Sequence, residues 1–421
     1  MASTPASSPR RSLGFLLGMS TLMLGANFVW VSYNNVVLPT LVENAAPDHR
    51  GLIVGLVGFF GIMVGITISI LSGIVSDHTT SRWGRRTPGI LVGVLLGLPT
   101  VVLAAIFPPS LPVIVCSFVG MQFFTNVSNG AWWPLLVDTV PERQRGLAGG
   151  IQGLLTLIGA ALGMVLVTWM NENGQLPLAL WVLGACLLGS GIVTCLTIRG
   201  YDRPAQKDTF RPVTALKEMF YVRTPVAVFF WVVLSALLAN MGLNSMQFFA
   251  RFFFEMYFPS ISPDTAFRLF GALSLAVTVL AAVVSGFLSD RFGRRRVILV
   301  GLYLAAATTL AMGLTDNLAG FLVLAAIRAA ATGPVVAVMP ALAGGLAPAD
   351  EAGKYMAYNN LSTGLSGALA ALTFGLVLTS LTKVAFVVLF AISALLFLAG
   401  GLVFQFKVTR SELERRIGRG G

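Results

Sequence analysis

Long apolar runs follow one another along this chain and restrict what it can fold into. Twelve of them lie between residues 13 and 406. A helix of about 20 residues spans the hydrocarbon core of a bilayer. Lipid offers no partner to backbone amides, and the runs lack the alternating pattern of barrel strands, so we predict helices. The expected fold is an all-α membrane protein with twelve transmembrane helices, and a content of 56% hydrophobic residues agrees with it.

A polar segment separates the predicted helices into two groups of six. Residues 199–224 hold six Lys and Arg residues and form a predicted linker between an N-terminal bundle, 13–198, and a C-terminal bundle, 225–406. The predicted helices of the first bundle are 13–41, 51–75, 88–107, 111–137, 147–170 and 177–198. Those of the second bundle are 225–254, 266–288, 297–314, 319–346, 354–379 and 384–406. Residues 1–12 and 407–421 are predicted tails.

The distribution of basic residues predicts the orientation of these helices. The side that holds both termini carries 23 Lys and Arg residues, whereas the other side carries only Arg50, Arg268 and Lys383. Basic residues accumulate on the cytoplasmic side, so we place both tails and the linker there. Topology thus accounts for the net charge of +11, and no nucleic-acid partner is expected. We expect an integral multi-pass monomer in a bacterial cytoplasmic membrane, with the lipid bilayer as its surroundings.

One polar loop occurs twice in the chain. Residues 73–88 read GIVSDHTTSRWGRRTP, and residues 286–296 read GFLSDRFGRRR. Both copies keep Gly, Ser-Asp, Gly and Arg-Arg in the same order, although the second is shorter. Two predicted helices also carry a late proline, Pro134 and Pro340. Such a repeat predicts two pseudo-symmetric six-helix bundles, an arrangement typical of carriers that rock about a site at the bilayer midplane.

The doubled loop, G-x-x-x-D-x-x-G-R-R, resembles a signature of the major facilitator superfamily. Residues 138–146, D-x-x-P-x-x-x-R-G, are similar to a second signature of that superfamily. The stretch SD-x-x-TSRWGRR-x-P is similar to the loop of sucrose carriers, within the glycoside, pentoside and hexuronide symporters. The resemblance implies a secondary-active transporter with the major facilitator fold, which moves a sugar or glycoside by alternating access with a proton or sodium ion. It implies no enzymatic activity and no cofactor, and the cysteines lack the spacing of a metal site.

The repeated loops have a physical role in such a carrier. Asp77 and Asp290 can accept hydrogen bonds from a neighbouring helix N-terminus and from the arginines of their own loops. We therefore interpret the following residues as gating residues: Asp77, Arg85, Arg86, Asp290, Arg294 and Arg295. The alternative is that the arginines only fix the topology, as basic loops commonly do.

Polar side chains inside the predicted helices recur at helical spacing. Gln122, Asn126, Asn129 and Trp133 lie at i, i+4, i+7 and i+11, which places them on one helix face. Asn240, Asn244, Gln247 and Arg251 repeat that spacing. The resemblance implies that helices 1, 4, 7 and 10 line a central cavity. The predicted substrate-binding residues are Asn27, Asn34, Gln122, Asn126, Asn129, Trp133, Asn240, Asn244, Arg328 and Asn359. The alternative is that the amides join helices, at about 0.6 kcal/mol each.

Three questions remain open from the sequence. No carboxylate lies near the middle of a predicted helix, so transport is either uncoupled or coupled through a peripheral acid such as Glu255; that acid alternatively neutralises Arg251. Arg328 binds the solute or, alternatively, backbone carbonyls freed near Pro334. The function itself is transport of a small polar solute, export of drugs or organic anions, or sensing or assembly without transport.

Overall fold

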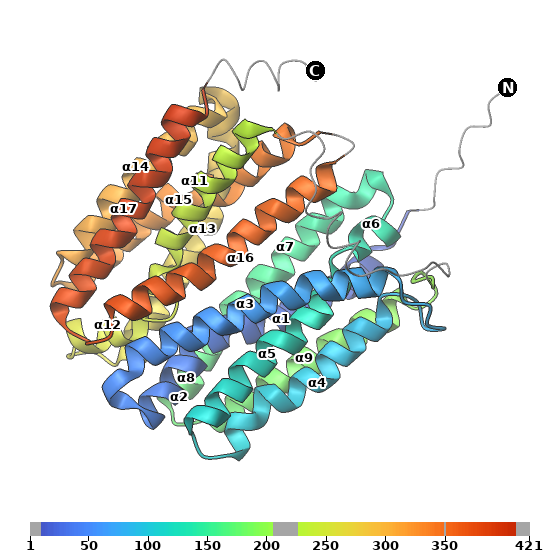
Figure 1. The fold of residues 1–421 in the computed structure, drawn as a ribbon, viewed down its shortest axis with the longest axis horizontal. Helices are drawn as coiled ribbons and strands as arrows, with labels where there is room; N and C mark the ends of the chain where they lie inside the picture. The colour runs from blue at the N-terminus through green and yellow to red at the C-terminus, as the bar shows by residue number, and fades with distance from the viewer. Residues whose placement is uncertain (1–9, 205–225, 349–350, 410–421) are drawn as a thin grey trace. The chain divides into compact units, whose positions relative to one another are not determined.

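The structure, a computed structural model, describes residues 10–204, 226–348 and 351–409 (Figure 1). Within these residues every regular element is a helix, and twelve helices are long and apolar enough to cross a membrane. The prediction of an all-α fold with twelve transmembrane helices is therefore confirmed. Most of the predicted linker and of both tails lies outside the described residues.

The helices follow the predicted order, with several broken into shorter pieces. Up to residue 198 the elements are α1 (Leu13–Ser32), η1 (Tyr33–Val37), α2 (Leu38–Ala45), η2 (Pro47–His49), α3 (Arg50–Asp77), α4 (Thr87–Ile106), α5 (Leu111–Trp132), α6 (Leu135–Thr139), η3 (Glu142–Gln144), α7 (Arg145–Leu162), η4 (Gly163–Val167), α8 (Thr168–Glu172) and α9 (Leu176–Ile198). Beyond the linker they are α11 (Ala227–Leu243), η5 (Asn244–Met246), α12 (Ala250–Tyr257), α13 (Pro263–Phe292), α14 (Arg294–Gly313), α15 (Leu318–Leu346), α16 (Ala352–Val377) and α17 (Lys383–Lys407).

The two late prolines have different effects on their helices. Pro134 follows the end of α5 and stands at the N-cap of α6, whereas Pro340 lies inside α15 together with Pro334. Proline removes one backbone donor and crowds the preceding turn, so a helix end beside it is expected. The repeat in sequence is thus not a repeat in local backbone structure at this point.

The predicted helix 225–254 is wrong as a single element. α11 ends at Leu243, η5 is a 3-10 turn, and α12 begins only at Ala250. A 3-10 turn has three residues per turn instead of 3.6, so a face counted along a continuous α-helix does not continue through it. The expected stripe Asn240, Asn244, Gln247 and Arg251 is therefore interrupted after its first members.

The chain packs into two compact units. Of the described residues, unit 1 comprises 10–33 and 64–204, and unit 2 comprises 34–63, 226–348 and 351–409. The sequence prediction assigned residues 34–63 to the first bundle, but by packing they belong to unit 2. The two units are defined by contacts in the folded chain, whereas the two predicted bundles are defined only by the position of the linker in the sequence.

Each unit has its own helix packing. In unit 1, α1 packs against α7 and α9, and α4 packs against α5 and α9 (Figure 1). In unit 2, α15 packs against α13 and α14, and α17 packs against α11 and α14. Aromatic contacts add to the core of unit 2, where the rings of Phe229 and Tyr355 meet edge to face with their centroids 4.5 Å apart. The Tyr355 hydroxyl also accepts a hydrogen bond from the Val226 N–H at 3.1 Å.

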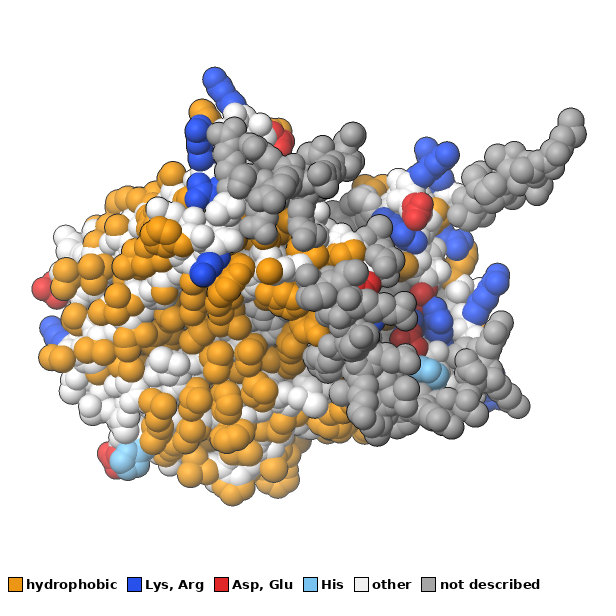
Figure 2. All heavy atoms as spheres, turned by 45° about the horizontal axis from the view of Figure 1, so that its top comes forward, with side chains coloured by type: hydrophobic (Ala, Val, Ile, Leu, Met, Phe, Trp, Pro, Cys, Tyr) orange, Lys and Arg blue, Asp and Glu red, His pale blue; other side chains and the backbone are white. Residues whose placement is uncertain are grey.

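Large apolar side chains lie on the outside of these helices. Phe287 is 73% exposed, Val384 71% and Val300 65%. Figure 2 shows hydrophobic side chains over much of the face in view, with Lys and Arg gathered in separate groups. Exposure of this extent is unfavourable in water but suits a surface that contacts lipid.

Candidate functional site

The first basic loop forms a buried ion-pair network in unit 1. Arg86 is only 2% exposed, and its Nη2 lies 2.5 Å from Asp77 Oδ1. Its Nε and Nη2 donate to Asp138 Oδ2 at 3.0 and 2.9 Å, and its Nη1 donates to Ser76 Oγ at 3.2 Å. Two carboxylates therefore compensate one buried guanidinium, as burial of a charge requires. The contacts join the end of α3, the start of α4 and α6.

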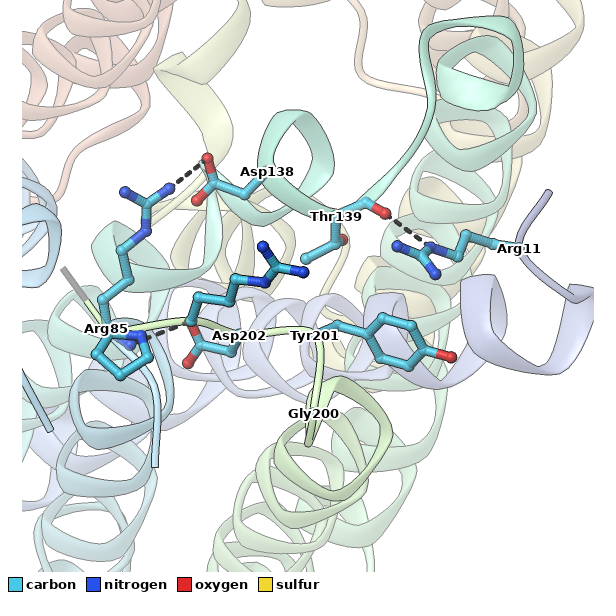
Figure 3. Close-up of a pocket in the computed structure, with 9 residues that line it drawn as sticks. Arg11, Arg85, Asp138, Thr139, Gly200, Tyr201 and Asp202 are labelled. Atoms are coloured by element: carbon cyan, nitrogen blue, oxygen red, sulfur yellow. Dashed lines mark hydrogen bonds and ion pairs between the residues drawn. The ribbon is translucent and has the colours of Figure 1, made fainter. Parts of the chain in front are cut away.

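Arg85 extends this network along the same loop. Its Nη2 lies 2.8 Å from Asp138 Oδ1 (Figure 3). Asp138 therefore contacts Arg85 as well as Arg86. Asp138 opens the D-x-x-P pattern, and Asp77, Arg85 and Arg86 were predicted gating residues. The structure thus brings three predicted residues together through an acid that the sequence identified only as part of a motif.

A second acid, Asp202, holds the N-terminus of α4. Its carboxylate accepts hydrogen bonds from the backbone N–H groups of Arg85 at 3.1 Å, Arg86 at 2.9 Å and Thr87 at 2.8 Å. An anion at a helix N-terminus is stabilised by free N–H groups and by the helix dipole. Gly84, with φ of +103°, admits the carboxylate, because a Cβ there would lie 2.2 Å from Asp202 Oδ2. The sequence predicts this capping role for Asp77, whereas in the structure Asp202 fills it.

A pocket of about 340 Å³ adjoins this network (Figure 3). Arg85, Asp138 and Asp202 line one part of it, and Arg11 and Tyr201 line another. The Arg11 guanidinium lies 4.2 Å from the centre of the Tyr201 ring, and its Nε donates to the Thr139 carbonyl at 2.9 Å. The chain segment before α1 is thereby fixed to the last residue of α6.

The second copy of the loop makes different contacts. Asp290 is exposed, and neither it nor Arg294 has a side-chain partner in the part of the chain that the structure describes. Arg295 donates to the carbonyls of Gln405 and Val408, each at 2.9 Å, at the end of α17. Gly345 stands three residues before Pro348, as Asp138 stands three before Pro141. In the second half of the chain a glycine therefore stands at the position of the acid that joins the arginines of the first loop.

A cluster of charged residues that no spacing in the sequence predicts lies in unit 2. Arg50 Nη1 lies 2.8 Å from Glu43 and 2.9 Å from Glu255. Arg251 pairs with Glu43 and, at 3.0 Å, with Asp264. The predicted alternative that Glu255 neutralises Arg251 is not what the structure shows, because Glu255 pairs with Arg50. The cluster ties the segment 34–63 to α12 and α13.

The predicted polar face of α5 is only partly buried. Gln122 is 1% exposed, while Trp133 is 51% exposed and stands just beyond the end of α5. The buried indole is that of Trp132, whose Nε1 donates to the Met19 carbonyl at 2.7 Å. Asn126 donates to the Gln122 carbonyl at 2.8 Å. The structure therefore buries Gln122 and leaves Trp133 exposed, so these two residues do not share a buried face.

Several predicted site residues have buried polar atoms without a hydrogen-bond partner among the described residues. These atoms are Gln122 Nε2, Asn129 Oδ1, Arg328 Nε and both side-chain polar atoms of Asn34. Other predicted residues are satisfied locally, since Asn27 donates to the Met23 carbonyl at 2.9 Å and Asn240 to the Ala236 carbonyl at 2.8 Å. Asn244 Nδ2 lies 3.5 Å from Ser366 Oγ, and Asn359 is 8% exposed.

The family of the chain follows from its sequence. A family model described as Major Facilitator Superfamily matches residues 13–262 and 245–421. The chain belongs to the Major Facilitator Superfamily. The fold, the doubled loop and the pattern of residues 138–146 agree with this assignment.

A known sugar transporter shares part of its sequence with this chain. Proton-associated sugar transporter A of Homo sapiens is 31% identical over 173 residues, which cover 37% of this chain and 22% of that protein. The match thus spans about a fifth of that relative's length.

Solved structures of other transporters resemble the chain over nearly its whole length. A bacterial homologue of the human lysosomal transporter Spinster, inward-facing and unoccupied, has a TM-score of 0.76 at 15% identity, over 96% of this chain and 99% of that one. The inward open xylose transporter XylE from E. coli has a TM-score of 0.67 at 16% identity, over 97% and 98%. Identities this low show the fold alone.

Proposed function

We propose that the protein is a secondary-active transporter that moves a small polar solute, a sugar or glycoside, across the membrane by alternating access. Membership of the Major Facilitator Superfamily supports transport. The sugar class is supported by the identity to proton-associated sugar transporter A and by the loop that resembles those of sucrose carriers. We further propose a monomer in a bacterial cytoplasmic membrane, with both termini in the cytoplasm because basic residues gather on that side.

The observation that carries this proposal is the pair of unsatisfied amides on α5. Gln122 Nε2 and Asn129 Oδ1 are buried, and neither has a hydrogen-bond partner among the described residues. Buried polar atoms are nearly always paired, so such atoms point to a partner that binds there, water or solute. Amides both donate and accept, which matches the hydroxyl groups of a sugar.

We propose that the solute contacts the polar side chains identified from the sequence. Gln122, Asn129 and Asn34 have atoms free to bind it. Asn27, Asn126 and Asn240 must exchange a bond to their own helix, so we expect smaller effects from them. Trp133, exposed at the end of α5, is a weaker candidate than the amides.

For gating we propose the first loop alone. Arg86 is buried between Asp77 and Asp138. Breaking these ion pairs leaves a charge either exposed or without a counter-charge, so the intact network favours one arrangement of unit 1. For Asp290, Arg294 and Arg295 we propose only the topological role, because the carboxylate of Asp290 is exposed without a partner among the described residues.

For coupling we propose the cluster around Arg50. It contains three carboxylates, Glu43, Glu255 and Asp264, and two arginines, so one negative charge is in excess. Glu255 has the most exposed side chain of the three, at 39%, and is therefore the one most accessible to a proton or a sodium ion from solution.

Counterflow in proteoliposomes tests the transport proposal. Vesicles loaded with a candidate sugar should accumulate the same labelled sugar through the wild-type protein. Gln122→Leu should abolish this uptake, whereas Asn173→Ala, which removes an exposed amide that bonds only to its own helix, should not. Absence of counterflow across a panel of sugars, glycosides and drugs would favour a sensor or assembly factor. Counterflow of drugs without sugars would favour an exporter.

A further inference from the structure

Arg328 is a buried charge in the middle of a membrane-spanning helix. It is 5% exposed and lies ten residues after the start of α15, which is about 15 Å along the helix. At i+4, i+7 and i+11 from it stand Thr332, Val335 and Met339, all buried. Residues at these spacings share a helix face, and Val335 and Met339 pack in the same core cluster as α11 residues. Arg328 therefore points into unit 2 and away from lipid.

The protein itself supplies no counter-charge to Arg328 within the described residues. Its Nε has no hydrogen-bond partner there, and no described carboxylate forms an ion pair with it. The described carboxylates of unit 2 all lie elsewhere: Glu43, Glu255 and Asp264 surround Arg50 and Arg251, and Glu351 lies 3.8 Å from Lys354. Asp48, Asp290 and Asp316 are exposed near helix ends.

Two other arginines of this chain, Arg86, which is buried, and Arg251, which is half-buried, show how it compensates such a charge. Arg86, 2% exposed, contacts Asp77 and Asp138, and Arg251 contacts Glu43 and Asp264. Each has two carboxylates, and Arg328 has none among the described residues. The structural alternative, a guanidinium that donates to carbonyls near Pro334, is not found either, because Arg328 donates no hydrogen bond to a carbonyl of the described residues. An uncompensated guanidinium in a low dielectric is costly, so its counter-ion is expected from outside the protein.

We infer that the transported solute carries one carboxylate, as a sugar acid does, and that Arg328 binds it. This inference rests on the proposed transport function and narrows its substrate class. A guanidinium presents two parallel N–H donors that match the two oxygens of a carboxylate. One arginine balances one negative charge, whereas a phosphate group carries about 1.5 to 2 and would leave an excess.

Matched pairs of acidic and neutral sugars test the inference on the purified full chain. Thermal unfolding is measured with glucuronate against glucose and with galacturonate against galactose, because a bound solute raises the unfolding temperature. The acid of at least one pair should stabilise the wild type more than its neutral partner. Arg328→Gln should lower the affinity for that acid about tenfold to a hundredfold, in line with the loss of a charge-assisted hydrogen bond. Arg296→Gln, which removes an exposed arginine on α14, is the matched control and should keep the wild-type affinity.

The possible outcomes separate this inference from the proposed function. Stabilisation and counterflow by neutral sugars alone would overturn the inference and leave sugar transport standing. No stabilisation and no counterflow by either class would overturn both. Arg328→Gln could instead be less stable but keep the wild-type ratio of affinities for the acidic and the neutral sugar. That result would assign Arg328 a structural role and overturn the inference. If Arg328→Gln does not fold, the wild-type pairs and Arg328→Lys, which keeps the charge without the fork and should bind the acid more weakly, still decide the question.

Discussion

The guanidinium of Arg294 lies 3.8 Å from the point where a side chain on Gly345 would begin. In the first half of the chain the matching residues are Arg85 and Asp138, which form an ion pair at 2.8 Å. The second half of the chain therefore keeps the arginine of the repeat and has a glycine at the position of its acid. The difference is one side chain, and it suggests a direct substitution.

Gly345→Asp should create the missing ion pair with Arg294. No other described atom lies within 4 Å of a Cβ at this position, so the new side chain fits. A partly exposed pair contributes about 0.2 to 1 kcal/mol to the free energy of unfolding. A double-mutant cycle with Arg294→Gln, read by thermal unfolding, should recover that coupling energy. Gly345→Asn is the neutral control, and an equal gain from Asn would show that the charge is irrelevant.

Removal of the cap on α4 should destabilise unit 1. Asp202→Ala leaves the N–H groups of Arg85, Arg86 and Thr87 without their acceptor, and loss of an N-cap costs about 0.5 to 2 kcal/mol. The unfolding temperature should fall, while Asp48→Ala, which removes an exposed acid, should leave it unchanged. Equal unfolding temperatures of Asp202→Ala and Asp48→Ala would show that Asp202 does not stabilise this helix.

The two acids that contact Arg86 should contribute unequally to the free energy of unfolding. Asp138 accepts from two nitrogens of the buried guanidinium, so Asp138→Asn should cost about 1.5 to 3 kcal/mol of the free energy of unfolding. Asp77 has a side chain that is 49% exposed, so Asp77→Asn should cost about 0 to 1 kcal/mol. Chemical denaturation of both variants measures the order, and a larger loss from Asp77→Asn would contradict the assignment.

On the gating proposal, Asp77→Asn should also change the accessibility of the transporter. Weakening a contact that holds one arrangement shifts the population toward the other. Thiol labelling of single cysteines on the two sides, in a background without Cys116, Cys186 and Cys195, reports this shift. Unchanged labelling together with normal transport would reduce the first loop to a topology signal.

Glu255→Gln should uncouple transport. Removing the exposed carboxylate leaves the cluster with equal numbers of acids and arginines, so no proton or sodium ion is needed to balance it. Uptake driven by an imposed gradient should fall to the equilibrium level, while counterflow continues. Asp316→Asn, another exposed acid of unit 2, should accumulate solute as the wild type does. Persistent accumulation in Glu255→Gln would place the coupling site elsewhere.

The sequence by itself determined the class of fold and the positions of nearly all membrane-spanning helices. Helix length, hydropathy and loop charge are local properties, so they are readable without a structure. The doubled loop was readable too, because identical residue types recur in order. Arg328 was recognisable as unusual because a charge inside an apolar run is costly wherever its helix packs.

Only the tertiary structure decided which charges meet. Asp202 caps a helix that begins 115 residues earlier, and Arg251 pairs with Glu43 across 208 residues, so no spacing rule relates them. Chain folding sets such distances through packing, which sequence separation does not encode. The break after Leu243 also escaped prediction, because a broken helix and a continuous one have the same hydropathy. The sequence identifies a residue's chemistry, and packing decides whether that residue has a partner. Arg86 has two carboxylate partners, whereas Arg328 has none among the described residues.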